Sequence, residues 1–129
     1  MAGILHLDTN VLIFGLDPTH ALRAQLLQWR AAGERIEVSA MAWAEFRCGP
    51  VSSATLLAWE QVLDREVIAM DRSIAERASD LFNLSGRRSR SLPDCLIAAT
   101  AIHAGARLAT LNPGDFERLT GHGLVLART

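Results

Sequence analysis

The N-terminal stretch changes its hydrophobic period at one residue, Asp8, and this change limits the possible folds more than any other feature. Ile4 to Leu7 is an apolar run, Asp8-Thr9-Asn10 is polar, and the residues after it are apolar at helical spacing. The run predicts a short buried strand that leads directly into a helix. A carboxylate at such a junction lies at the carboxyl edge of an α/β sheet, the usual place for chemistry in that architecture. The alternative is that Asp8, Thr9 or Asn10 only caps the helix.

The rest of the chain repeats this alternation of strands and helices. Further strands are expected at 35–38, 66–70, 107–111 and 124–126. Helices are expected at 9–16, 20–32, 40–48, 52–63, 71–84, 92–103 and 116–119. Such alternation favours an α/β fold whose parallel sheet is covered by helices on both faces.

The length and hydropathy bound the class of protein. The 129 residues fit one domain, 1–129. No apolar run reaches the roughly 18 residues of a membrane span, and no signal peptide is recognisable, so we expect a cytoplasmic protein without a membrane partner.

The composition excludes several kinds of chemistry. All 13 basic residues are Arg, which excludes a Schiff-base lysine and the lysine of a phosphate-binding P-loop. The two cysteines, Cys48 and Cys95, have no CxxC spacing and are interpreted as small reduced core residues. The four histidines have no metal-ligand spacing such as HxxxH, so a zinc site is not expected.

Three more acidic residues occur where a parallel sheet could bring them to the edge that carries Asp8. Asp115 follows the strand 107–111, Asp94 lies in the first turn of the preceding helix, and Glu45 lies in an otherwise apolar helix. Each has a structural alternative. Asp115 can cap a helix, Asp94 can form a capping box with Ser91, and Glu45 can mark a solvated stripe. One shared site explains the positions of the four acids more simply than four separate structural roles.

Clustered carboxylates repel one another, so they either take up protons or bind a cation. A ligand set of oxygen atoms without His or Cys selects Mg²⁺ or Mn²⁺. One or two such ions can activate water and stabilise the charge that develops on a phosphodiester. The four acids therefore predict a metal site suited to phosphodiester chemistry.

The densest cluster of charge is the basic loop that contains Arg87, Arg88 and Arg90. A solvated loop is the usual explanation for such a run. The functional interpretation is an RNA contact, because Arg clusters bind nucleic-acid backbones without regard to sequence.

Four segments, taken together, resemble a known family in order and spacing. They are Leu7-Asp8-Thr9-Asn10, then Ser39 with the apolar helix to Glu45-Phe46 and Gly49, then 94–101 (DCLIAATA), and finally 109–116 (ATLNPGDF). In this arrangement the chain is similar to the PIN-domain ribonucleases, and specifically to the VapC-type toxins of type II toxin–antitoxin systems. The clearest departure is Cys95, where that family often has Ala.

The resemblance implies a three-layer fold with a parallel sheet of about five strands, and Mg²⁺-dependent cleavage of RNA. It makes Asp8 and Asp94 the direct metal ligands, with Asp115 completing the site and Glu45 orienting or deprotonating the attacking water. Thr9, Asn10, Thr110 and Asn112 match the family's supporting polar positions. The resemblance also implies a homodimer and a cognate antitoxin that binds operator DNA in the complex.

Three other functions fit the sequence less well. A phosphatase of the haloacid dehalogenase type needs a second Asp at the position of Asn10 and a Lys, and a receiver-like module also needs a Lys. A catalytically degenerate PIN domain that only binds RNA or a protein partner is the main alternative. All four acids are present, however, and a binding module gains nothing from negative charge where phosphates approach.

Overall fold

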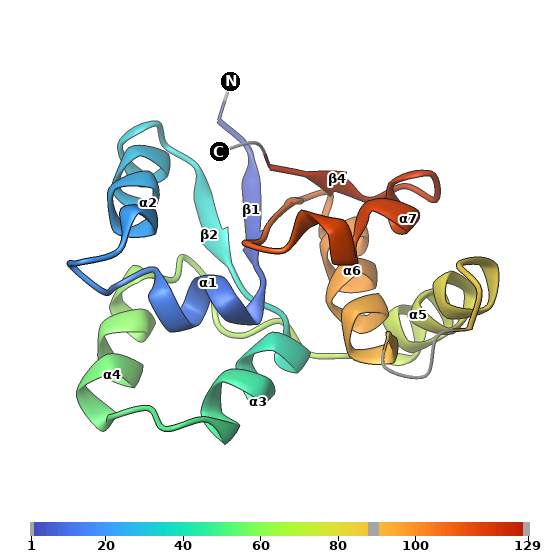
Figure 1. The fold of residues 1–129 in the computed structure, drawn as a ribbon, viewed down its shortest axis with the longest axis horizontal. Coiled ribbons are helices and arrows are strands. Elements are labelled where there is room, and N and C mark those ends of the chain that lie inside the picture. The colour runs from blue at the N-terminus through green and yellow to red at the C-terminus, as the bar shows by residue number, and fades with distance from the viewer. Residues whose placement is uncertain (1, 88–90, 128–129) are drawn as a thin grey trace.

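Four parallel strands form one sheet, which Figure 1 shows running through the middle of the molecule. The computed structural model describes residues 2–87 and 91–127. The sheet has the order β2-β1-β3-β4, and its strands are β2 (Arg35–Glu37), β1 (Ile4–Leu7), β3 (Arg107–Ala109) and β4 (Val125–Leu126). The predicted α/β fold with a parallel sheet is therefore confirmed. Because all pairings are parallel, the carboxyl ends of β1, β2 and β3 lie at one edge.

The segment predicted as a strand at 66–70 forms only one parallel bridge, between Ser39 and Ile68. The Ile68 N–H donates to the Val38 carbonyl at 2.9 Å, and the Ile68 carbonyl accepts from Ala40 N–H at 2.9 Å. Nearer the start of the segment, the Asp64 carboxylate takes the Ile36 N–H at 2.7 Å in place of a backbone acceptor. The Asp64 N–H in turn donates to the Ile36 carbonyl at 2.9 Å, so a side chain supplies one of the two hydrogen bonds at this point. The described residues thus contain four regular strands and a bridged segment beside β2, rather than about five strands.

The helices agree with the predicted ranges to within a few residues. They are α1 (Thr9–Phe14), α2 (Ala21–Ala31), α3 (Ala40–Cys48), α4 (Ser53–Val62), α5 (Arg72–Leu84), α6 (Leu92–Ala104) and α7 (Glu117–Thr120), with a 3-10 turn η1 (Pro113–Asp115). Ser39, Ser52 and Asp71 cap α3, α4 and α5 through their side chains. Gly105 ends α6 in the left-handed conformation, at φ 68°, which glycine adopts without steric cost.

Helix α6 is the central helix of the core. It contacts α3, α5, β1 and β3, and six of its residues are buried: Cys95, Ile97, Ala98, Ala99, Thr100 and Ala101. Its small side chains allow the neighbouring elements to approach closely. In Figure 1, α1 to α4 lie on the β2 side of the molecule and α5 to α7 lie on the other side. Cys95 is buried as predicted, but Cys48 is exposed, because it is the last residue of α3 before the turn at Gly49.

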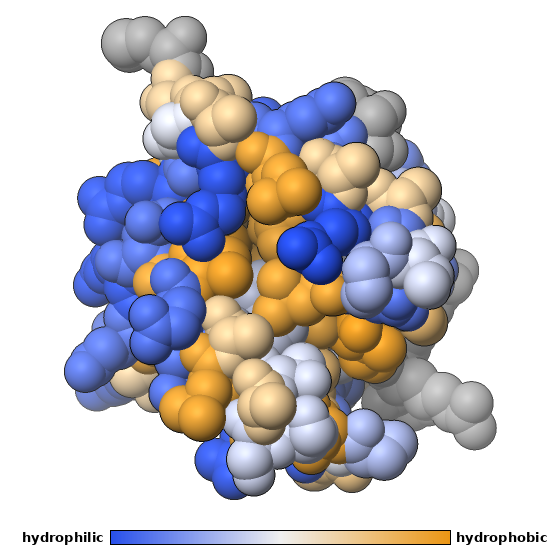
Figure 2. Space-filling view, turned by 90° about the vertical axis from the view of Figure 1, so that its left-hand side faces the viewer, coloured by the Kyte–Doolittle hydropathy of each residue, from blue (hydrophilic) through white to orange (hydrophobic). Residues whose placement is uncertain are grey.

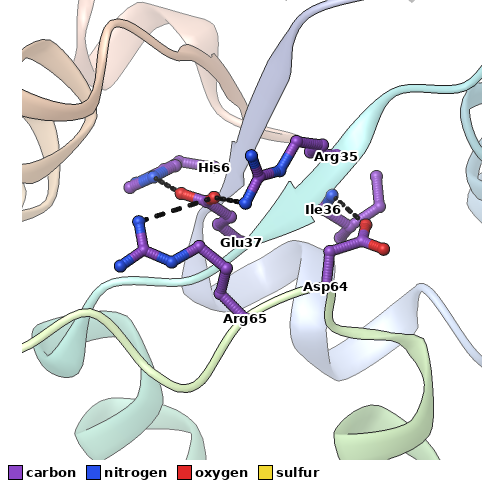
Figure 3. A network of polar contacts seen from close by, with 6 residues as sticks. All are labelled: His6, Arg35, Ile36, Glu37, Asp64 and Arg65. Atoms are coloured by element: carbon purple, nitrogen blue, oxygen red, sulfur yellow. Dashed lines mark hydrogen bonds and ion pairs between the residues drawn. The ribbon is translucent and has the colours of Figure 1, made fainter.

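A buried hydrogen bond between His6 and Glu37 joins β1 to β2 below the carboxyl edge (Figure 3). His6 Nε2 lies 3.0 Å from Glu37 Oε1, and each side chain is 1% exposed. Burial lowers the pKa of His6, although Glu37 opposes this, so the imidazole is held mainly neutral. The charge of Glu37 is balanced instead by two exposed guanidinium groups, Arg35 at 3.5 Å and Arg65 at 4.0 Å. Arg65 thereby ties the bridged segment to β2.

Trp59 fixes α4 against the end of α1. It is fully buried, and its indole N–H donates to the Leu12 carbonyl at 2.9 Å. That carbonyl is one of the last four of α1, which have no partner within their own helix. Gly15 is required here because a Cβ atom at this position would lie 3.0 Å from the Trp59 ring and 2.6 Å from the Val11 carbonyl oxygen.

We expect Trp59→Phe to destabilise the protein by about 1–3 kcal/mol, because it leaves the Leu12 carbonyl buried without its donor and opens a small void. The free energy of unfolding is measured by urea denaturation. Leu57→Ala on the same helix is the control: Leu57 is 59% exposed, so its loss should change stability by no more than about 0.5 kcal/mol. Equal midpoints for Trp59→Phe and the wild type would contradict this role.

Candidate active site

Asp8 is held at the carboxyl end of β1 by two neighbouring elements. Its N–H donates to the Ala109 carbonyl of β3 at 2.9 Å. Its Oδ1 accepts the Thr9 N–H at 2.8 Å, and its Oδ2 accepts the Thr110 hydroxyl at 2.7 Å. Asp8 therefore does cap α1, and the same carboxylate is also fixed from the end of β3. Only 7% of it is exposed, and burial raises its pKa, as does repulsion from Glu45 and Asp115.

Glu45 lies on α3 and faces the start of α1. Its Oε1 accepts the Thr9 hydroxyl at 2.8 Å, and the residue is half-buried. Because Thr9 also donates its N–H to Asp8, this one residue sets the two carboxylates beside each other. The solvated-stripe alternative for Glu45 is thus not what the structure shows.

Asp94 lies in the first turn of α6 and is half-buried. Ser91 precedes the helix as its N-cap, but its side chain makes no capping hydrogen bond, so the predicted capping box is not formed by this serine. Burial, and then repulsion from Asp8, Asp115 and Glu45, raises the pKa of Asp94 to about 6. Arg118 opposes this rise.

Asp115 ends η1 and is exposed. Its charge nevertheless acts on both Asp8 and Asp94. The structure thus brings all four predicted acids, from β1, α3, α6 and η1, to one edge of the sheet. They are close enough to repel one another.

The donor chemistry of this edge fits a hard cation such as Mg²⁺, since every donor is an oxygen. Within residues 2–87 and 91–127, however, no three Asp, Glu, His or Cys side chains converge closely enough to hold an ion. An ion at this edge would have to draw the acids inward. Asp8, which is held by hydrogen bonds to both oxygens, is the fixed point toward which the others would move.

The four predicted supporting residues lie around Asp8. Thr9 and Thr110 donate their hydroxyls to Glu45 and Asp8, respectively. Asn10 Oδ1 accepts the Leu111 N–H at 3.1 Å, which fastens the loop after β3 to α1. Asn112 contributes through its backbone, because its N–H donates to the Thr110 hydroxyl oxygen at 3.0 Å. The Thr110 hydroxyl hydrogen thereby remains directed at Asp8.

Of the predicted basic loop, Arg87 is exposed with φ 55°, whereas Arg88 and Arg90 lie outside the described residues. A different arginine, Arg118 of α7, lies at the acids and was not predicted. Its Nη1 donates to the Asp115 carbonyl at 3.0 Å, and its buried Nε has no hydrogen-bond partner among the described residues. The sequence feature that could have indicated Arg118 is its position three residues after Asp115, a spacing of about one helical turn.

Comparison with known proteins identifies relatives of this chain. The family model described as PIN domain matches residues 5–121. Among solved structures, VapBC2 from Rickettsia felis bound to a DNA fragment from its promoter has a TM-score of 0.77 and 23% identity, covering 96% of this chain and 97% of that one. A toxin–antitoxin complex from Klebsiella pneumoniae has a TM-score of 0.69 and 26% identity, covering 88% and 90%. VapBC-5 from Mycobacterium tuberculosis, of the VapBC family of toxin–antitoxin systems, has a TM-score of 0.62 and 26% identity, covering 96% and 98%. No curated protein matches the sequence.

The raised pKa of Asp94 predicts how stability depends on pH in the presence of a chelator. A carboxyl group whose pKa is raised by folding favours the fold while it is protonated, and this contribution is lost as pH rises from about 4 through about 6. The Asp94→Asn variant has no carboxyl group to titrate here, so it does not lose this stability as pH rises. We expect the variant to match the wild type at pH 4 and to exceed it by about 1 kcal/mol at pH 7.5, a value discounted for solvent screening at this half-exposed group.

Urea denaturation of both proteins across this pH range measures the effect. Asp8 and His6 also titrate differently in the folded protein, so only the difference between the two proteins isolates Asp94. Asp80→Asn changes an exposed carboxylate on α5 and serves as the control. A variant less stable than the wild type at pH 7.5 would mean that Asp94 stabilises the fold as an anion.

Proposed function

The chain belongs to the PIN domain family, and from this premise we propose that it is a Mg²⁺- or Mn²⁺-dependent endoribonuclease, the toxin of a toxin–antitoxin pair. The observation that carries this proposal is the group of four carboxylates at one sheet edge, where burial, and then repulsion from Asp8, Asp115 and Glu45, raises the pKa of Asp94 to about 6. Such repulsion is relieved by a bound cation. A site of this kind suits the hydrolysis of RNA phosphodiesters.

We assign a role to each of the four acids. Asp8 and Asp94 would hold the ion, and Asp115, the most exposed of the four, would complete the site directly or through a water molecule. When bound, the metal supplies Lewis acidity and lowers the pKa of a water molecule. Glu45, oriented by the Thr9 hydroxyl, would position that water or accept its proton. Thr9, Asn10, Thr110 and Asn112 would keep the acids in place as supporting groups.

The proposed partners are an RNA substrate, a cognate antitoxin and a second copy of the chain. The toxin–antitoxin complex from K. pneumoniae supports the antitoxin, and the promoter fragment bound to VapBC2 of R. felis supports operator DNA as a partner of the complex. Figure 2 shows apolar side chains exposed among hydrophilic ones on the α2 and α4 side of the molecule, which suits a protein partner. The exposed large apolar residues of α1, α2 and α4 are Ile13, Phe14, Leu27 and Leu57.

We place the protein in the cytoplasm, where its proposed RNA substrate is found. Among the described residues, no helix is both long enough and apolar enough to span a bilayer.

The alternative is a degenerate PIN domain that binds RNA or a protein without cleaving. The retained acids argue against it. Burial and repulsion from the neighbouring acids disfavour the charged forms of Asp8 and Asp94. A module that only binds polyanions gains nothing from carboxylates held in this way.

Activity and metal binding can be separated by substitution. With Mg²⁺ or Mn²⁺ present, the wild type should cleave single-stranded RNA, and a chelator should stop the reaction. Asp8→Asn should abolish cleavage and also the rise in stability that metal gives the wild type, about 2.7 kcal/mol at a metal concentration of about 100 times Kd. Gel analysis of cleavage and thermal unfolding with and without metal measure the two effects.

Glu45→Gln provides the contrast. If Glu45 acts on the water, this variant should lose about 10²–10⁴-fold in kcat while retaining the stabilisation by metal. Glu76→Gln on α5, where the carboxylate is exposed and paired with Arg72, should match the wild type in both assays. Cleavage that survives Asp8→Asn or proceeds in a chelator would refute the proposal.

We also propose that Arg87, Arg88 and Arg90 contact the RNA backbone. Changing all three to Ala should lower RNA affinity and reduce the slope of log K against log salt by about 2, since each contact with a single strand contributes about 0.7. Fluorescence polarisation across a salt series measures the slope. Arg72→Ala, which removes an arginine whose side chain is 90% exposed, is the control. An unchanged affinity and slope in the triple variant would exclude the loop from the RNA interface.

A further inference from the structure

A pocket of about 360 Å³ opens beside Glu45, on the side of that residue where α3 leads into α4. It is lined by Ile13, Glu45, Phe46, Gly49, Pro50, Val51, Ser52 and Thr55. Resting on the proposed ribonuclease function, we propose that this pocket receives one unstacked base of the RNA, next to the phosphodiester that is cleaved. None of its residues except Glu45 has a role in the site described above.

The position of the pocket gives the first argument. Glu45 is a wall of the pocket and is also joined, through the Thr9 hydroxyl, to the residue that binds Asp8. A phosphodiester placed at the acids would therefore have its adjoining nucleotide at the mouth of this pocket. Single-stranded RNA is recognised through bases that are splayed out of the stack and enclosed by side chains.

The lining of the pocket has the chemistry of a base-binding site. Ile13, Phe46 and Val51 supply apolar contact for a planar ring. Ser52 and Thr55 place two hydroxyls in the same wall, 2.9 Å apart. Their mutual hydrogen bond uses one of the two hydroxyl hydrogens, so one remains to donate, and lone pairs remain to accept. The edge of a base presents both donors and acceptors.

The charge of the pocket disfavours phosphate, and its size excludes larger ligands. The carboxylate of Glu45 repels phosphate, so a neutral base is the part of the RNA that fits here. The volume is near the lower end of the range of about 300–1,000 Å³ that small-ligand pockets span. That is room for one compact group, whereas an amphipathic helix needs a groove long enough for anchors at i, i+3 or i+4, and i+7.

The test fills the pocket by substitution and measures whether the protein still distinguishes intact RNA from RNA that lacks one base. Thr55→Phe puts a ring into the cavity and removes one hydroxyl, while the Thr55 N–H can still donate to Ser52 and cap α4. Ala54→Phe introduces the same ring at an exposed neighbour that does not line the pocket, and is the matched control. Val51→Trp, which fills the pocket from the preceding turn, is used if Thr55→Phe does not fold.

Each protein is given a short RNA and the same RNA with one abasic nucleotide, placed in turn on either side of the cleaved bond. Affinity is measured in chelator, and kcat/KM is measured with Mg²⁺. The wild type and Ala54→Phe should prefer the intact RNA about tenfold at one of the two positions, as expected for the loss of one base contact. Thr55→Phe should treat the two RNAs alike.

Equal discrimination by Thr55→Phe and the wild type, or no discrimination by the wild type, would overturn the inference. So would a Thr55→Phe variant that only loses inhibition by the antitoxin, since the pocket would then belong to a protein partner. Base discrimination in the chelator assay without any cleavage in Mg²⁺ would support the base pocket and refute the ribonuclease, so the two proposals can fail separately.

Discussion

The parallel pairing of β1 with β3 is the contact on which the rest of the site depends. It brings Asp8 next to Ala109 and Thr110, which are about a hundred residues away in the chain. The Asp8 N–H donates to the Ala109 carbonyl, and the Asp8 carboxylate accepts the Thr110 hydroxyl. The same pairing sets the loop after β3 against α1 through Asn10 and Leu111. Without this register, Asp115 would have no fixed relation to Asp8, and the acids would not share one edge.

Two of the four carboxylates, Asp8 and Asp94, oppose folding, although the proposed chemistry depends on them. Burial and mutual repulsion disfavour the charged forms of Asp8 and Asp94, and this unfavourable energy must be offset by the rest of the structure. The apolar packing of α6 against β1, β3 and α5 contributes the stability that offsets this energy. The small buried residues that follow Asp94 in α6 let the helix pack tightly while its first turn presents a destabilising charge. The first turn of α6 thus carries a residue of the proposed site, and the buried residues after it contribute stability.

Much of this arrangement could be predicted from the sequence because it depends on local patterns. The change from an apolar run to Asp-Thr-Asn fixed the end of β1, and the alternation of strands and helices implied parallel pairing. Glu45 stood out because it is a single carboxylate in an apolar helix. It could not be predicted that the 66–70 segment forms a single bridge rather than a regular strand, since apolar residues do not determine how many backbone pairs a segment makes. Cys48 was placed wrongly in the core because apolar neighbours in sequence do not determine which side of a helix end faces solvent.

The pocket beside Glu45 could not have been predicted by the same reasoning, because it forms only where Ile13 meets the segment that joins α3 to α4. Arg118 was also missed, although its spacing from Asp115 was a local signal. Arg118 and the pocket together explain how a strongly acidic edge could receive a polyanion. Arg118 places a positive charge on the Asp94 side of the cluster, and among the described residues its Nε has no partner. On the Glu45 side, the apolar pocket offers contact to an uncharged group. Attraction for the substrate would then come from the flanks of the acidic cluster, so the carboxylates themselves need not contribute to RNA affinity and remain available for a cation.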